Sequence, residues 1–121
     1  MNAAIFKNRT KKLALECGKF VDDLPQKTSI RIYGGQVIRS SASVGANYRA
    51  ACRAKSLADM INKLKIVEEE ADETLYWLEL IEESLNLKTE ILLWLKKESD
   101  EILSMVVASI NTLKKKQKPK E

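Results

Sequence analysis

Residues 39–56, RSSASVGANYRAACRAKS, combine small side chains with four basic ones and contain hardly a bulky apolar residue. Such a stretch could form a flexible loop, a phosphate-binding loop or a helix that packs very closely on its neighbours. The helix is favoured because apolar and small residues recur in steps of four and three, the spacing of one helix face. Small seam residues let helix backbones approach closely, so we predict a tightly packed central helix. Its seam comprises Ile30, Gly34, Val37, Ser41, Val44, Tyr48 and Ala51.

A helix with the same spacing precedes the central one, and Pro25 ends it because proline cannot continue a helix. Thr28 or Ser29 is the expected N-cap of the central helix. Ser56 is the expected N-cap of the next helix, because Asp59 follows it in the arrangement of a capping box, in place of the usual Glu or Gln. The seam of the first helix comprises Phe6, Thr10, Leu13, Cys17, Phe20 and Leu24.

Two further amphipathic segments follow, separated by a turn at residues 84–90. Four such segments of roughly 20 to 30 residues, joined by short connections, predict an all-α, up-down-up-down antiparallel four-helix bundle. We expect a bundle domain over residues 1–116 and a basic C-terminal tail over residues 117–121. The third helix has the predicted core face Leu57, Met60, Leu64, Val67, Ala71, Leu75, Leu78 and Leu85. The fourth has Ile91, Leu95, Ile102, Met105, Val106, Ser109, Ile110 and Leu113.

The composition of the 121-residue chain narrows the possible chemistry. It contains no histidine, which excludes histidine general bases and the usual zinc and di-iron ligand sets. We therefore expect no metal, no cofactor and no enzymatic activity. Cys17 and Cys52 are expected to be buried thiols. No stretch is apolar enough to span a bilayer and the N-terminus lacks the apolar run of a signal peptide, so a cytoplasmic location without a membrane partner is expected.

The net charge of +4 conceals a strong segregation along the chain. Residues 1–56 contain 11 Lys and Arg against 3 acidic residues, and residues 57–101 contain 5 against 13. Residues 102–121 contain 5 against 1. A basic first half, an acidic third quarter and a basic tail together predict either a charged partner or an internal match between the segments.

A second group of apolar residues lies outside the predicted core seams. On the third helix Ile66, Trp77 and Ile81 fall about 90° from the core face. The fourth helix adds residues 92–94, which include Trp94. Tryptophan is enriched at interface centres, so we predict Ile66, Trp77, Ile81 and Trp94 as an oligomer interface. The alternative is a wide bundle in which these residues border the core.

Four arginines of the central helix, Arg31, Arg39, Arg49 and Arg53, fall within an arc of about 80° opposite the seam. They form a line about 30 Å long that could follow a phosphate backbone, because guanidinium groups can bind phosphate with two hydrogen bonds. We predict that they form a nucleic-acid-binding face. Alternatively, they form structural salt bridges with the acidic residues of the segment 68–83. The sequence supports both interpretations equally.

Residues 39–83 contain an ordered series of motifs: Arg39-Ser40-Ser41, Ser43-Val44-Gly45-Ala46-Asn47, Arg53, Ser56 and the segment from Glu68 to Ala71 with Tyr76-Trp77-Leu78. This series resembles the signature of a bacterial four-helix-bundle family, the 23S rRNA intervening-sequence proteins. Many relatives have Asn-x-Ala-Glu-Gly in this region. Here Asn47 is followed by Tyr48-Arg49-Ala50-Ala51, which places the chain in a subgroup without the Glu-Gly pair.

This resemblance implies a homopentameric ring of bundles, in agreement with the second apolar face. It also implies similarity to the accessory protein of diversity-generating retroelements, a pentameric barrel that binds nucleic acid and a reverse transcriptase. It implies no catalytic residue. Asn47 lies on a closely packed helix and needs a hydrogen-bond partner, for which Glu69 or Glu70 is expected.

The expected function is therefore that of a non-catalytic homo-oligomeric bundle, which binds RNA or DNA through the central-helix arginines. The alternative is a protein–protein interaction scaffold. In it the arginines are consumed by salt bridges, and the acidic and apolar faces dock a protein such as a reverse transcriptase. Salt distinguishes the two, because phosphate binding weakens steeply with added salt and apolar docking does not.

Overall fold

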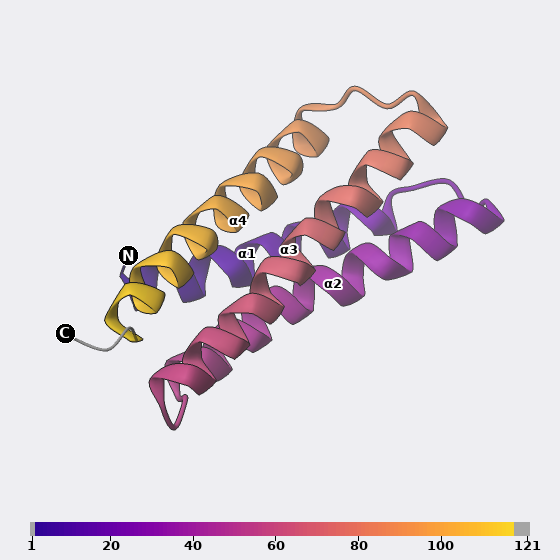
Figure 1. The fold of residues 1–121 in the computed structure, drawn as a ribbon. Helices are drawn as coiled ribbons and strands as arrows, with labels where there is room; N and C mark the ends of the chain where they lie inside the picture. The colour runs from indigo at the N-terminus through magenta and orange to yellow at the C-terminus, as the bar shows by residue number, and fades with distance from the viewer. Residues whose placement is uncertain (1, 118–121) are drawn as a thin grey trace.

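Figure 1 shows the computed structural model, which describes residues 2–117 as four helices that run alternately up and down. They are α1 (Ala3–Asp22), α2 (Thr28–Cys52), α3 (Leu57–Leu85) and α4 (Glu90–Gln117). Each helix packs on the next, and α4 returns to contact α1, so that the four enclose one core. No strand occurs in the described range. The predicted all-α four-helix fold is confirmed, and residues 118–121 of the expected tail lie outside the described residues.

The core seams predicted for α1 and α2 are confirmed at every position. Thr10 is buried with them, and its hydroxyl donates to the carbonyl oxygen of Lys7 at 3.1 Å. Ser41 likewise donates to the carbonyl oxygen of Ile38 at 3.4 Å. A hydroxyl that bonds back to its own helix needs no outside partner, so these polar residues can lie in an apolar core.

The faces predicted for α3 and α4 need correction. Leu57, Met60, Leu75 and Leu85 are only partly buried, and Ile91 is 38% exposed. The buried residues follow steps of three and four more strictly than predicted. On α3 they are Ile61, Leu64, Val67, Ala71, Thr74, Leu78 and Ile81, and on α4 they are Leu92, Leu95, Ser99, Ile102, Val106 and Ile110.

The helix ends agree with the expected caps at α3 but not at α2. Ser56 is the N-cap of α3, and its Oγ accepts from the backbone N of Asp59 at 3.1 Å. The Asp59 carboxylate reaches back to the backbone N of Lys55 at 3.2 Å, so the capping box is closed one residue earlier than usual. The N-cap of α2 is Lys27, without a side-chain hydrogen bond, so the prediction of Thr28 or Ser29 is wrong.

Small residues bring α2 close to both of its neighbours. A Cβ on Gly45 would lie 3.2 Å from Thr10 Oγ1, so α1 and α2 meet there at nearly minimal separation. On the other side, the hydroxyl oxygens of Ser40 and Thr74 are 2.8 Å apart, and both residues are fully buried between α2 and α3. The small residues of the stretch 39–56 are thus explained by close helix packing. Across residues 2–117, no helix is both long and apolar enough to cross a membrane.

Gly34 and Gly35 are adjacent on α2 but differ in their surroundings, and this difference can be tested. A Cβ on Gly35 would meet no atom within 4 Å, whereas one on Gly34 would lie 2.8 Å from Val21 Cγ1, in a stiff β-branched side chain. Alanine is favoured over glycine inside a helix by about 0.5–1 kcal/mol. We expect urea denaturation to show that Gly35→Ala raises the free energy of unfolding and Gly34→Ala lowers it. Equal stabilisation by both would contradict the close contact between α1 and α2.

Candidate nucleic-acid interface

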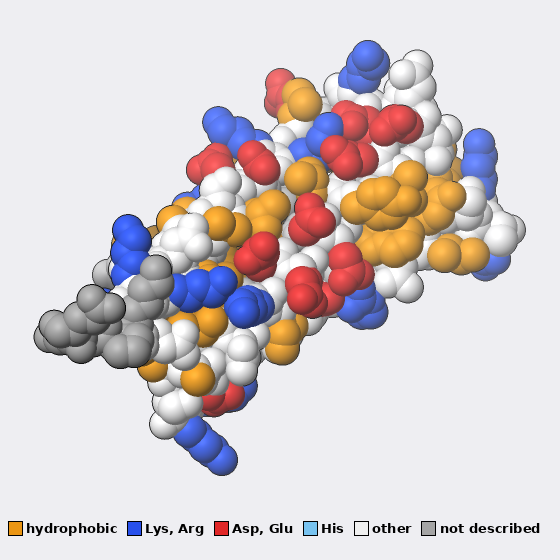
Figure 2. Space-filling model, viewed as in Figure 1, with side chains coloured by type: hydrophobic (Ala, Val, Ile, Leu, Met, Phe, Trp, Pro, Cys, Tyr) orange, Lys and Arg blue, Asp and Glu red, His pale blue; other side chains and the backbone are white. Residues whose placement is uncertain are grey.

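The antiparallel topology gathers the basic parts of the sequence at one end of the bundle. The start of α1, the end of α2, the start of α3 and the end of α4 all lie there (Figure 1). The corresponding segments 2–12, 41–68 and 104–117 contain twelve Lys and Arg against two acidic residues. We call these three segments the basic end. The other described segments, 13–40 and 69–103, contain seven Lys and Arg against fourteen acidic residues. Figure 2 shows acidic side chains across the middle of one face, beside an apolar patch.

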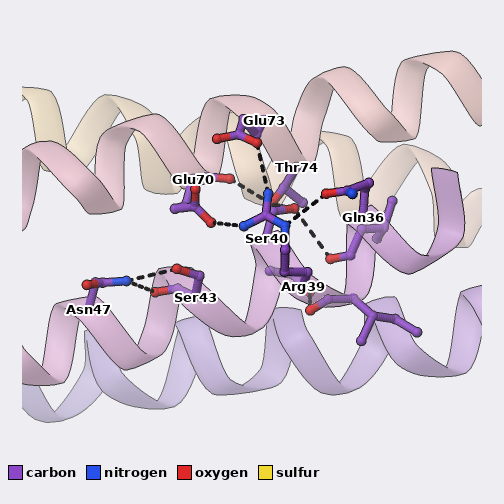
Figure 3. A network of polar contacts seen from close by, with 11 residues as sticks. Gln36, Arg39, Ser40, Ser43, Asn47, Glu70, Glu73 and Thr74 are labelled. Atoms are coloured by element: carbon purple, nitrogen blue, oxygen red, sulfur yellow. Dashed lines mark hydrogen bonds and ion pairs between the residues drawn. The ribbon is translucent and has the colours of Figure 1, made fainter. Parts of the chain in front are cut away.

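Arg39 is held between α2 and α3 by carboxylates (Figure 3). Its Nη1 donates to Glu70 Oε2 at 2.8 Å, and its Nη2 donates to Glu73 Oε1 at 2.8 Å. Its Nε donates to Gln36 Oε1, also at 2.8 Å. All three nitrogens of the guanidinium are therefore engaged within the bundle. For Arg39, the structure matches the alternative in which the arginine is a salt-bridge partner.

Arg31, Arg49 and Arg53 have different surroundings. All three are exposed, and none forms a salt bridge with another residue in the described range. α2 contains no acidic residue that could pair with them along the helix. Arg49 and Arg53 belong to the basic end, whereas Arg31 lies near the start of α2. The four arginines therefore do not form one uniform track, because only three of them have their charge available to a ligand.

The basic face of α1 is partly neutralised by α4. Arg9 Nη2 donates to Glu98 Oε1 at 2.7 Å, and its Nε donates to Glu98 Oε2 at 3.0 Å. This two-bonded contact raises the pKa of Arg9 above its ordinary value. Lys12 lies over the ring of Trp94, with its Nζ 5.4 Å from the centroid. Lys7 and Lys11 line a groove between α1 and α2 and form no salt bridge with another described residue.

The four expected interface residues separate into three environments. Ile66 is 42% exposed on α3, as an interface residue must be. Ile81 is completely buried in the core, so its assignment to an intersubunit surface is corrected. Trp77 and Trp94 are partly buried on the outside of the core. Trp77 stacks on Tyr33 of α2 with ring centroids 6.1 Å apart, so it already has a partner within its own chain.

Two other sequence expectations also change. Cys17 is buried as expected, and burial raises its pKa to about 12, but Cys52 is exposed at the end of α2. Asn47 does not bond Glu69 or Glu70. Its Nδ2 donates to the carbonyl oxygen of Ser43 at 2.9 Å and to Ser43 Oγ at 2.8 Å, within α2 (Figure 3). Among the described residues, no group of three or more carboxylate or thiol side chains is arranged to hold a metal ion.

The comparisons with known proteins identify the family. The model of the 23S rRNA-intervening sequence protein family matches residues 3–108, which is nearly the whole bundle. The chain belongs to this family. A similar solved structure is a protein of unknown function from the S23 ribosomal protein family of Bacteroides thetaiotaomicron, with 32% sequence identity and a TM-score of 0.82. The match covers 92% of this chain and 99% of that one. No functionally curated protein matches the chain.

In this member of the 23S rRNA-intervening sequence protein family, the contact between α2 and α3 predicts a pH effect. The neighbouring Glu70 carboxyl raises the pKa of Glu73, by hydrogen bonding and charge, more than Arg39 lowers it. A carboxyl with a raised folded-state pKa contributes stability at low pH that is lost as pH rises through that pKa. We therefore expect Glu73→Gln to be more stable than wild type at pH 7, with the difference vanishing below about pH 4.

Thermal unfolding followed across this pH range measures the effect. Glu69→Gln is the matched control, because Glu69 is exposed on the same helix and forms no salt bridge with the rest of the described chain. A Glu73→Gln variant that is less stable than wild type at pH 7 would mean that the Arg39 contact outweighs the repulsion from Glu70.

Proposed function

We propose that this protein is a non-catalytic, homo-oligomeric bundle that binds RNA or DNA through its basic end. The observation that carries the proposal is the pair Arg49 and Arg53, exposed on a helix without acidic residues and without salt bridges to the rest of the described chain. Twelve cations against two acids at one end of so small a domain create a positive potential that attracts polyanions. Membership of a family named after an rRNA insertion is compatible with such a ligand.

The proposed assembly is a pentameric ring, as the family resemblance implies. Two exposed side chains of α3, Ile66 and Tyr76, support an intersubunit surface on this helix, since large apolar groups there are left in contact with water. An oligomer would also repeat the basic end several times in one particle. Repeated weak phosphate contacts then add through avidity.

One observation favours a second function. The engagement of Arg39 by Glu70 and Glu73 is the contact expected of a protein–protein interaction scaffold with structural salt bridges. In that function the acidic surface of α3 and its aromatic residues would dock a protein, with a reverse transcriptase as one candidate. The nucleic-acid proposal is preferred because it accounts for the three arginines that have no carboxylate partner within residues 2–117. A cytoplasmic location remains a prediction.

Arginine substitutions separate these functions. Arg49→Ala and Arg53→Ala should each weaken binding to a structured rRNA fragment several-fold and reduce the slope of log affinity against log salt by about one. Arg39→Ala removes the same charge from the same helix, but its guanidinium is already neutralised, so it should lower stability and leave affinity close to wild type. Fluorescence anisotropy at several salt concentrations measures affinity and slope. Equal losses for all three variants, or no binding by wild type at low salt, would reject the proposed arginine interface.

The assembly is tested at Ile66. Ile66→Glu places a charge in the proposed intersubunit surface without disturbing the core, so light scattering should report a smaller particle with unchanged helix content. Trp77→Ala is less informative because it also removes the contact with Tyr33. Leu15→Glu is the control, since Leu15 is 58% exposed on α1, a helix that contributes none of the residues predicted for the interface. A particle of unchanged mass in Ile66→Glu would place the interface elsewhere.

A further inference from the structure

A groove of about 480 Å³ lies between the first half of α1 and the second half of α2. Its walls carry Lys7 and Lys11 from α1 and Arg49 from α2. No acidic residue lines it, and these three cations form no salt bridge with another described residue. Three positive charges around one hollow repel each other, and no carboxylate of the groove offsets this repulsion. An anion bound in the groove would therefore reduce it.

The groove is hollow because most of the residues on its α2 side are small. A Cβ on Gly45 would lie 3.2 Å from Thr10 Oγ1 there, and Ala42 and Ala46 also line the groove from α2. Ala42 and Ala46 are exposed to solvent, so packing of α1 on α2 does not require them to be small. Longer side chains at these two positions would fill the groove without entering the core. The hollow therefore exists independently of what the fold needs at this point.

Two other hollows in the described part of the bundle have different chemistry. One of about 600 Å³ at the basic end is mostly apolar, with Met60, Met105 and Leu113 in its wall. One of about 390 Å³ between α3 and α4 is bordered by Glu82 and Glu83. Neither combines several cations with an absence of carboxylates. The α1–α2 groove is thus the hollow best matched to a phosphate group.

We propose that this groove seats one phosphate and its sugar from a single-stranded segment of nucleic acid. The volume lies within the range of about 300–1,000 Å³ that is typical of small-ligand sites, so one nucleotide unit fits. Arg49 provides a planar fork for two phosphate oxygens, while Lys7 and Lys11 act as point charges on the opposite wall. Because two helices in contact have axes only about 8–10 Å apart, the furrow between their outer surfaces is narrow, so a single strand can lie along it whereas a duplex would touch only its rims. The inference rests on the proposed nucleic-acid function, to which it adds a binding site for one nucleotide and a preference for single strands over duplexes.

Filling the groove without changing its charge tests the inference. Ala46→Leu should weaken binding to a fluorescent single strand of about 12 nucleotides by roughly tenfold, and Ala42→Leu should reproduce this loss. Ala58→Leu, an exposed substitution on α3 outside the groove, is the control and should bind like wild type. Circular dichroism establishes whether each variant is folded. If one of the two filling variants does not fold, the other still tests the groove. Wild-type affinity in folded filling variants would overturn the proposal.

Removing the groove charges distinguishes a phosphate site in the groove from general electrostatic attraction by the basic end. Lys7→Ala with Lys11→Ala should reduce the salt slope for the single strand by about 0.7, which corresponds to the loss of one phosphate contact. Lys114→Ala with Lys115→Ala removes the same charge at the same end but outside the groove, and should reduce the slope less. Equal reductions by the two pairs would mean that the field alone attracts the ligand. Wild type should also bind the single strand more tightly than its duplex, and the reverse order would contradict the groove.

A small phosphate-ester probe distinguishes failure of the proposed nucleic-acid function from failure of the groove as a phosphate site. If wild type binds no oligonucleotide, the proposed function fails, and uridine monophosphate is then titrated into ¹⁵N-labelled protein. Amide shifts confined to residues 7–11 and 45–49, and lost in Ala46→Leu, would establish the groove as a phosphate-ester site. Shifts that are absent or spread over the basic end would overturn it.

Discussion

The distance at which α2 can approach α1 and α3 is the constraint on which the rest of the structure depends. Gly34 and Gly45 present no side chain to α1, and Ser40 meets Thr74 of α3 with hydroxyl oxygens 2.8 Å apart. Because both neighbours lie so close, the outer face of α2 is bordered by their side chains. The charge on that face therefore depends on the neighbouring side chains of α1 and α3 as much as on α2 itself.

The antiparallel topology then brings basic segments that are separate in the sequence together at one end of the bundle. Short connections place the basic starts of α1 and α3 beside the basic ends of α2 and α4, so segments that are distant in sequence add their potentials. The acidic part of α3 lies toward the other end, next to the first half of α2. Partial internal matching and a net basic end are thus both consequences of one topology, and the sequence alternatives are not mutually exclusive.

The sequence predicted the fold class and the two seams that follow one clear period, but it misplaced residues on the longer helices. Ile81 lies about 90° from the core on a wheel of 100° per residue, yet it continues the steps of three and four from Val67 through Leu78. In α4, the residues from Ile91 to Leu95 are all apolar, so no periodicity fixes which of them faces inward. The N-cap of α2 and the partner of Asn47 depend on local geometry that periodicity does not contain.

The arginines show why the site was less predictable than the fold. Arg39 and Arg49 differ by only about 80° around α2, a difference that a wheel treats as one face. That angle turns Arg39 toward α3, which provides Glu70 and Glu73, and turns Arg49 toward α1, which provides Lys7. One guanidinium is neutralised and the other is surrounded by like charge. Since no acidic residue lines the groove where α1 and α2 meet, an anion bound there would come from the proposed ligand and not from the groove's own side chains.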